Sequence, residues 1–179
     1  GLYSQPDGPC PNPGDLLPKG KIAEARASYE EQIEHAVKDM IYVASRMYEA
    51  GADGINFDTT AAAGDAEFYA TIKAISELHK KYPDMCIQMG MASEFVLGMH
   101  GELAWDGVRL AGLYPHKQLE LAQKVGVRIY GPAVNIVTTR SLPWNVSRSV
   151  TFCKACTDVA TIPVHACVGM GVCGIPLTL

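Results

Sequence analysis

Apolar residues recur along the chain at helical spacing and then in short runs, and this alternation predicts helices followed by strands. Between Lys21 and Ala50 the apolar positions lie three or four residues apart, which places them on one helical face. Gly51 can then adopt a positive φ as the C′ residue, so the helix is predicted to end there. A short strand is predicted to follow over 52–58.

The same alternation repeats three more times. A helix opened by Gly64 and Asp65 is predicted to stop before Pro83, and the later elements are expected to start at Pro115 and Pro143. The other predicted elements are a strand over 85–90, a long loop over 92–114, a helix ended by Gly126, a strand over 127–131, a helix over 141–160 and a strand over 163–168.

Strand starts near residues 54, 86, 127 and 164 give the spacing of βα units, which are joined by right-handed crossovers and have parallel strands. A doubly wound sheet and a barrel both fit that spacing. Neither Gly-x-Gly-x-x-Gly after the first strand nor a P-loop is present, which disfavours a nucleotide-binding open sheet. We therefore predict an α/β fold. It would be a partial (β/α)8 TIM barrel of about four units over 21–179, after a loop-rich N-terminal segment over 1–20.

Both ends of the chain fit a piece of a longer protein, since the first residue is Gly1 and the last follows a strand-and-loop pattern. Four strands make half of an eight-stranded barrel and would leave two exposed edges. We expect either that further strands belong to the protein or that two copies close each other.

The composition of the chain argues against some classes of binding partner. The 179 residues are 48% hydrophobic with a net charge of −4, which gives no electrostatic reason to bind nucleic acid. No apolar run approaches the roughly 18 residues of a spanning helix, so no membrane association is expected. Six cysteines in a chain of this size, without a secretory signal, indicate reduced thiols and a cytoplasmic protein.

Candidate chemistry lies where the predicted strands end, because reacting groups in both architectures collect past the carboxyl ends of the strands. Asp58 leaves the first strand, and Glu94 follows the second. Glu94 could equally be solvated or cap a helix, and Asp65 could simply cap its own helix. A catalytic histidine and a histidine buried inside the barrel are equal alternatives for His165. We predict Asp58, Glu94 and His165 as catalytic residues, and as substrate-binding residues Thr59, Thr60 and Asn135.

No metal site is predicted. Cys153 and Cys156 form one Cys-x-x-Cys on a helix, where apolar neighbours favour a place in the core. Structural zinc would require two more ligands at recognisable spacing.

Four separate stretches carry a further signal: Gly51-Ala-Asp-Gly-Ile-Asn-Phe-Asp-Thr-Thr60 with the following Ala-Ala-Gly-Asp65, Gly98-Met-His-Gly101, Leu110-Ala-Gly-Leu-Tyr-Pro-His116, and Val168-Gly-Met-Gly-Val-Cys-Gly-Ile-Pro176. In these stretches, in the same order and over most of the chain from Tyr3 to Pro176, the sequence resembles the dimethylamine–corrinoid methyltransferases. Cys173 departs from the small residues expected at that position.

The resemblance implies a TIM-barrel enzyme of methylamine metabolism and methanogenesis. Such an enzyme moves a methyl group from dimethylamine to the cobalt of a corrinoid partner protein, binds no cofactor directly and forms homo-oligomers at full length. Its catalytic residue would be a pyrrolysine, expected beyond Leu179. Carboxylates such as Asp58 and Glu94 would then stabilise a cationic nitrogen and transfer protons, and Asn135 or His165 would orient the amine.

Two other functions remain open at this stage. A metal-dependent lyase of the aldolase type could use Asp58, Glu94 and His165 on the same scaffold. A Schiff-base aldolase is disfavoured because no predicted strand carries a lysine. A non-catalytic copy that only docks a corrinoid protein is the third possibility.

Overall fold

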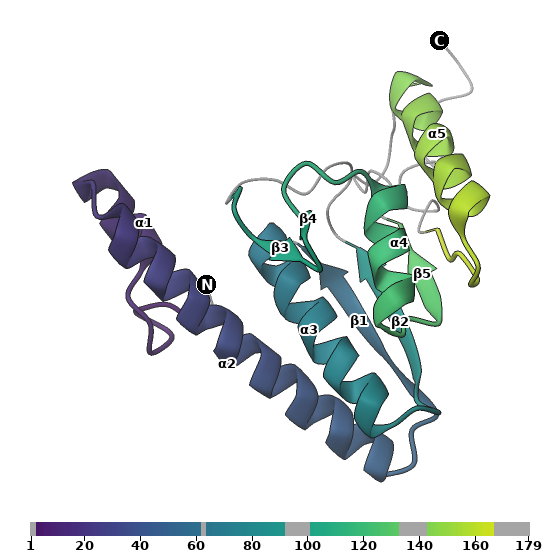
Figure 1. The fold of residues 1–179 in the computed structure, drawn as a ribbon, viewed down its shortest axis with the longest axis horizontal. Helices are drawn as coiled ribbons and strands as arrows, with labels where there is room; N and C mark the ends of the chain where they lie inside the picture. Colours follow the sequence, from purple (N-terminus) through teal and green to yellow (C-terminus); the bar gives the residue numbers. More distant parts are fainter. Residues whose placement is uncertain (1–2, 62–63, 92–100, 133–142, 167–179) are drawn as a thin grey trace.

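The computed structural model describes residues 3–61, 64–91, 101–132 and 143–166. Five α-helices, one 3-10 helix and five strands occur in these ranges, as Figure 1 shows. In chain order they are α1 (Pro13–Leu16), η1 (Leu17–Lys19), α2 (Ile22–Glu49), β1 (Gly54–Thr60), α3 (Asp65–Lys81), β2 (Cys86–Met91), β3 (Ala104–Trp105), β4 (Val108–Arg109), α4 (Pro115–Val125), β5 (Ile129–Gly131) and α5 (Pro143–Val159).

Three strands form one parallel sheet in the order β1-β2-β5. A single parallel bridge between Tyr130 and Val164 continues this order beyond β5, with His165 donating its amide hydrogen to the carbonyl of Tyr130 at 2.8 Å. The strands therefore follow one another across the sheet in chain order. The predicted α/β class and the parallel direction of the strands are confirmed.

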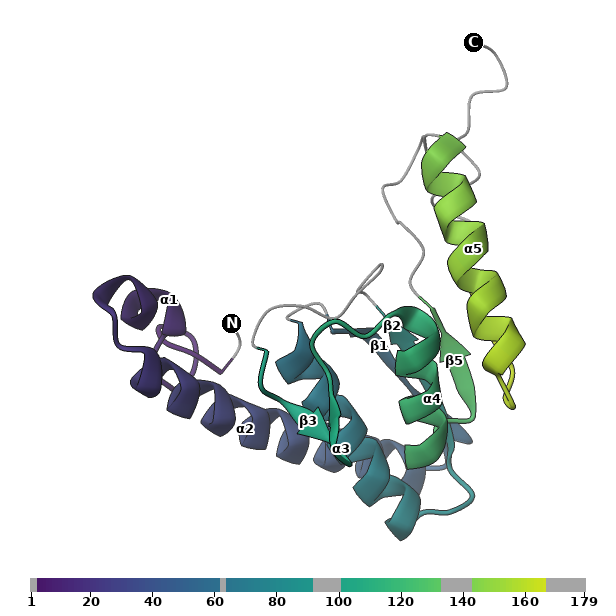
Figure 2. The same cartoon turned by 45° about the horizontal axis from the view of Figure 1, so that its top comes forward.

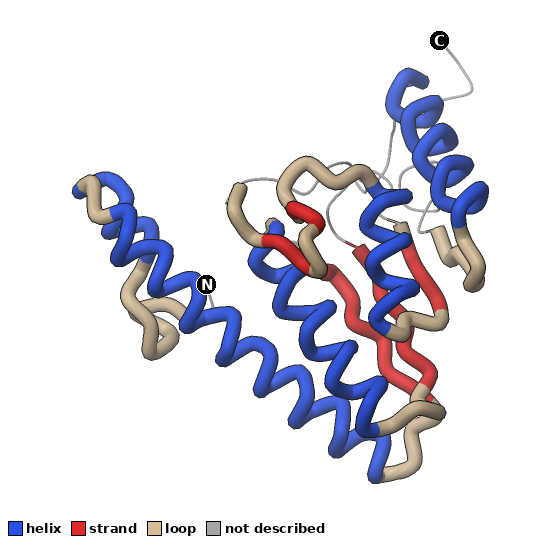
Figure 3. The backbone as a smooth tube through the Cα atoms, in the orientation of Figure 1, coloured by secondary structure: helices blue, strands red, loops and turns tan. Residues whose placement is uncertain are grey.

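Helices α3 and α4 lie on one side of this sheet, in front of the strands in Figures 1 and 3, and α2 runs alongside α3. Their apolar side chains pack with the odd-numbered residues of β2 and with Tyr130 of β5 in one core cluster. Ile87, Met89 and Tyr130 have no exposed surface. Because a buried side chain of this size contributes about 1.5–3 kcal/mol, this layer supplies much of the folding free energy.

The predicted helix boundaries agree closely with the structure. Gly51 and Gly126 have φ values of 104° and 107° after α2 and α4, a conformation that an L side chain rarely adopts. Pro115 begins α4 at a position whose amide hydrogen is not needed, and α3 ends before Pro83 as predicted.

Two segments predicted as loops contain regular structure. Residues 1–20 include α1 and η1, and α1 is capped by Asn12, whose side chain accepts from the amide of Gly14 at 2.8 Å. The long loop includes the β3–β4 hairpin, joined by Asp106 and Gly107 with φ values of 47° and 77°. Asp-Gly with positive φ at both residues is a preferred two-residue hairpin turn, so the signal was present in the sequence.

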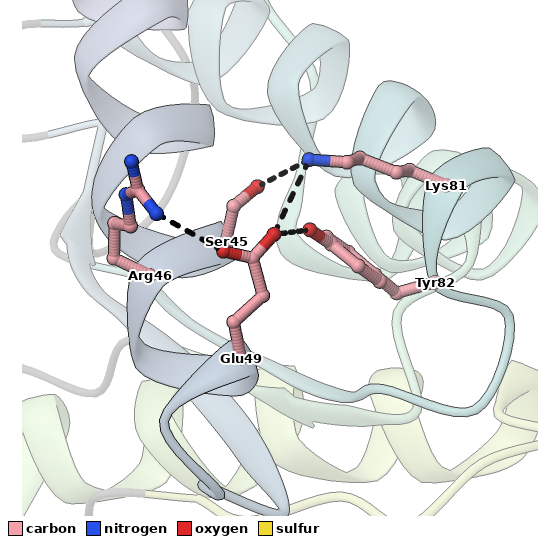
Figure 4. A network of polar contacts seen from close by, with 5 residues as sticks. All are labelled: Ser45, Arg46, Glu49, Lys81 and Tyr82. Atoms are coloured by element: carbon pink, nitrogen blue, oxygen red, sulfur yellow. Dashed lines mark hydrogen bonds and ion pairs between the residues drawn. The ribbon is translucent and has the colours of Figure 1, made fainter.

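The C-terminal ends of α2 and α3 are joined by a polar network, shown in Figure 4. Glu49 accepts hydrogen bonds from Tyr82 and Arg46, and Lys81 lies 3.7 Å from the same carboxylate. The Tyr82 hydroxyl lowers the pKa of Glu49, with smaller contributions from Lys81 and Arg46. These side chains are half exposed, so the network positions the helix ends more than it stabilises the fold.

Within the described ranges, none of the helices has the length and apolar character that crossing a lipid bilayer requires. A cytoplasmic location stays a prediction.

Candidate functional site

The side of the sheet opposite the helices carries polar side chains. Strand residues alternate between the two faces, so Asn56 and Asp58 of β1 point away from the helices, as does Gln88 of β2. Asn56 and Asp58 are exposed and Gln88 is partly exposed, whereas Ile87 and Met89 beside Gln88 are fully buried. We call the side formed by the even-numbered residues of β1 and β2 the open face.

Asp58 is aimed by an irregularity in β1. Phe57 pairs with Met89 and Thr60 with Met91, so three steps along β1 match two along β2 and the strand bulges at Asp58 and Thr59. Such bulges redirect side chains and are common next to active sites. The following residue, Ala61, is buried with a φ of 68°, an unusual conformation for a residue with a side chain.

The carboxylate of Asp58 leans over the neighbouring strand at Gly90. A Cβ atom added to Gly90 would lie 2.8 Å from Oδ1 of Asp58 and 3.8 Å from Oδ1 of Asn56. Only a glycine leaves that space, because real Cβ contacts are longer. Gly90 therefore allows the two polar side chains of β1 to approach the centre of the sheet.

His165 reaches the open face from the opposite edge of the sheet, beyond β5. Its Nδ1 lies 3.3 Å from Nε2 of Gln88, close enough for a hydrogen bond in the tautomer whose Nδ1 is unprotonated. His165 is exposed in the described residues, and both alternatives for it, a catalytic histidine and a barrel-interior histidine, stay open. The ring is oriented by Gln88 and available to a ligand.

Two glycines occupy the sheet between Asp58 and His165. Gly90 pairs with Gly131 of β5, and a Cβ added to Gly131 would lie 3.4 Å from the Cα of Gly90. Neither residue has a side chain, so the floor between the carboxylate and the imidazole is bare backbone. A small ligand could rest there with an acid on one side and a nitrogen base on the other.

The predicted site residues have different outcomes. The structure brings Asp58 and His165 to the open face. The side chain of Thr60 is buried instead, and its hydroxyl donates to the carbonyl of Phe57 at 3.2 Å across the bulge. The side chain of Thr59, and both Glu94 and Asn135, lie outside the described residues. The catalytic and binding roles remain predictions.

Asn56, Gln88 and the glycine pair were missed by sequence reasoning. The signal was available, because polar residues at alternate positions of an otherwise apolar strand indicate one face that is not buried in the core. The prediction instead considered only strand ends.

Cys153 and Cys156 lie on α5; Cys156 has the expected place in the core, whereas Cys153 is partly exposed and belongs to neither core cluster. Cys156 is fully buried within the main core cluster, and burial, with a smaller effect of Cys153, raises its pKa to about 12. Burial also raises the pKa of Cys153. Both thiols are therefore protonated at neutral pH and are poor nucleophiles.

Two of the grooves formed by the described residues run beside α2. One is lined by α2 residues together with Ala66, Glu102 and Leu103, and its charged pair Arg26–Glu102 is an exposed ion pair of 2.7 Å. The other follows β1 and α2, and Asp58 contributes to its wall. Neither combines a carboxylate with a nitrogen base as the open face does, so we place the candidate site on the open face.

The chain matches a family of known proteins. A family model described as dimethylamine methyltransferase matches residues 1–179, the whole chain.

Proposed function

Because this chain belongs to the dimethylamine methyltransferase family, we propose that it moves a methyl group from dimethylamine to the cobalt of a corrinoid partner protein. The observation that carries the proposal is the open face, where Asp58 leans over Gly90 and His165 is held by Gln88. The corrinoid stays with the partner protein as methyl acceptor, and this chain binds no cofactor of its own for the reaction. In this proposal the protein acts in the cytoplasm and as a homo-oligomer.

The scaffold in this proposal is an arc of a (β/α)8 barrel. Three features support it: strands in chain order, helices α3 and α4 on one side, and polar side chains on the other. A doubly wound sheet would instead reverse its strand order and carry helices on both faces. The open face is then the inner wall of the barrel at its catalytic end.

The substrate fits the open face in charge. Dimethylamine is protonated at neutral pH, and a small cation is attracted to the carboxylate of Asp58. Gly90 and Gly131 place no side chain of their own between Asp58 and His165. Asp58 would hold the cationic nitrogen, while Nε2 of His165, which carries the ring proton when Gln88 donates to Nδ1, would donate a hydrogen bond to the nitrogen as methylamine leaves.

The reaction breaks one N–CH₃ bond and forms one Co–CH₃ bond, with methylamine as the leaving group. Cobalt(I) supplies the electron pair for the new bond, and the nitrogen keeps the pair of the broken bond. The family resemblance implies an imine of pyrrolysine that activates the amine, and residues 1–179 include no pyrrolysine. We therefore assign to this chain the binding of the cation and the hydrogen bonding of its nitrogen.

The test is methyl transfer by the full-length protein from dimethylamine to a corrinoid protein reduced to the cobalt(I) state. We expect a methylcobalt absorption spectrum to appear together with one equivalent of methylamine. Binding of the corrinoid protein without transfer would favour the docking function. If methyl transfer fails and the protein instead cleaves a carbon–carbon bond in a reaction that a chelator inhibits, the metal-dependent lyase would be favoured.

A further inference from the structure

A second group of chemically active side chains lies at the N-terminal half of α2, away from the sheet. Cys10, Glu31 and His35 each place a ligand atom within 4.8 Å of the other two. Glu31 and His35 are one helical turn apart on α2, and Cys10 comes from the loop that precedes α1. Figures 1 and 2 show this loop against the N-terminal half of α2.

The loop that carries Cys10 is fixed by its own hydrogen bonds. The amide of Cys10 donates to the carbonyl of Tyr3 at 2.9 Å, and the amide of Gln5 donates to the carbonyl of Cys10 at 2.8 Å. The hydroxyl of Ser28 on α2 donates to the carbonyl of Pro11 at 2.5 Å. The backbone on both sides of Cys10 is therefore held, and its thiol has no exposed surface.

His35 is also oriented by its neighbours. The ring of Tyr3 stacks on the imidazole with 6.1 Å between centroids and an interplanar angle of 10°. The hydroxyl of Tyr3 donates to Oδ2 of Asp39, one turn further along α2, at 3.1 Å. Contacts that fix the plane of an imidazole are typical around metal-binding histidines.

We propose that Cys10, Glu31 and His35 bind a zinc ion that fastens the N-terminal loop to α2. Sulfur, imidazole nitrogen and carboxylate oxygen are the three donor types that zinc accepts, and their mixture does not suit calcium or magnesium. With a thiolate, a carboxylate and a neutral imidazole, a Zn²⁺ centre has no net charge, which suits a buried thiol. The prediction of no metal, made from sequence spacing, missed this set because Cys10 joins it only through the fold.

The distances allow the site to close. Ligand atoms of a tetrahedral zinc centre lie about 3.3–3.6 Å apart, given metal–ligand distances of about 2.0–2.3 Å. A group within 4.8 Å needs side-chain movements of about an ångström, and Glu31 is exposed and can move. Water or another side chain would fill the fourth position.

A nucleophilic thiol is the main competing function for such a triad, and the structure disfavours it. Cys10 is fully buried, so a substrate cannot reach its sulfur. Burial and the neighbouring Glu31 carboxylate also raise the pKa of the thiol, which lowers the thiolate fraction. A metal ion reverses that effect because its positive charge stabilises the thiolate.

The experiment is titration of the metal-free, reduced full-length protein with Zn²⁺ and separately with Co²⁺. We expect one equivalent of zinc per chain at this site and, with cobalt, a sulfur-to-metal charge-transfer band. Cys10→Ser and His35→Gln should each weaken binding by more than about 100-fold, since even an outer-shell change costs about 10–100-fold. The double variant C153A/C156A, in which Cys10 is intact, should bind as the wild type does.

Glu31→Gln keeps the test valid if the other variants fail to fold. The side chain of Glu31 is exposed, and the substitution removes only its negative charge. It should keep the wild-type circular dichroism spectrum and lose most of the zinc affinity. Absence of a stoichiometric zinc ion in the wild type would overturn the proposal. The proposal would also be overturned if zinc binding survived in Cys10→Ser and disappeared in C153A/C156A. Methyl transfer is not a readout here, so failure of the proposed function leaves this test unaffected.

Discussion

The two faces of the parallel sheet are built from neighbouring residues of the same strands, yet they have opposite character. On β2, Ile87 and Met89 are fully buried against the helices, while Gln88 between them contacts His165 on the open face. On β5, Tyr130 is fully buried and Gly131 beside it has no side chain at all. A shift of one residue in register would exchange these roles, so the alternation fixes both the core and the site.

The difference separates stability from chemistry. The covered face is apolar and close-packed in the described residues, and the hydroxyl of Tyr130 within it lies 3.3 Å from Oε1 of Gln118 on α4. Burial raises the pKa of Tyr130 well above its ordinary value, so that hydroxyl stays protonated. The open face holds an acid, two amides and an imidazole around two glycines. Substitutions on the first face should change folding, and those on the second should change turnover.

The largest effect is expected for Asp58→Asn in the full-length protein. The neutral amide keeps the shape but loses the charge that would hold the substrate nitrogen, so methyl transfer to cobalt(I) should fall by about 10²–10⁴-fold. The melting temperature should be unchanged. Asp53→Asn is the matched control, because Asp53 is an exposed aspartate just before the opposite end of β1. If Asp58→Asn transferred methyl groups at the wild-type rate, the open face would have no role in the reaction.

Next in size is a pair of substitutions at adjacent residues of β2. Met89→Ala removes a fully buried side chain and should lower the free energy of unfolding by about 2–5 kcal/mol. Gln88→Ala removes a side chain from the open face and should change it by no more than about 0.5 kcal/mol. Urea denaturation followed by circular dichroism measures both. If both substitutions lowered the free energy of unfolding equally, the side chains of the open face would be packed in solution. The contrast between the two faces would then be wrong.

The fold could be predicted from sequence where local signals are strong. Helix ends at Gly51 and Gly126 followed from the need for positive φ, and the parallel strands followed from the spacing of the βα units. The helices in residues 1–20 were missed because α1 and η1 are too short to show apolar periodicity. The fourth strand, predicted over 163–168, forms a parallel bridge at Val164 in the described residues, where the carbonyl of Pro163 accepts from the amide of Tyr130 at 3.0 Å.

The site was only partly predictable, for a different reason. Asp58 and His165 could be found because they lie near strand ends, but a sequence does not show which partner a strand residue meets on the next strand. The contact of Gln88 with His165 spans 77 positions, and the approach of Asp58 to Gly90 depends on a bulge. The Cys10, Glu31 and His35 cluster also depends on a loop folding back onto α2.

A smaller effect is expected for Gly90→Ala. The new methyl group would lie 2.8 Å from Oδ1 of Asp58, so the carboxylate must move away from the sheet centre. Misplacement by about an ångström can cost about 10²-fold in rate, and we expect a loss of about 10- to 100-fold in methyl transfer. Stability should change by less than about 1 kcal/mol, because the obstructing atom is the end of an exposed side chain.

The double variant Gly90→Ala with Asp58→Asn sharpens this prediction. If Gly90 acts only by leaving room for Asp58, the two losses should not add, and the double variant should be about as active as Asp58→Asn alone. Additive losses would mean that the glycine itself borders the substrate.

The smallest effect is expected for the Glu49 network. It tests whether exposed polar contacts contribute as little to stability as the open face or as much as the covered face. Because Tyr82 lowers the pKa of Glu49 in the folded protein, the stabilisation is present above the unfolded pKa of 4.5 and is lost as the pH falls through the lower, folded value. Glu49→Gln should therefore reduce the melting temperature slightly at pH 7, and the difference from the wild type should shrink as the pH falls through the folded pKa and the carboxyl becomes protonated. Thermal melts of both proteins across this range measure the difference. A loss at pH 7 as large as that of Met89→Ala would show that hydrogen bonds reached by water rival buried apolar contacts, and the contrast between the two faces would then need another cause than burial.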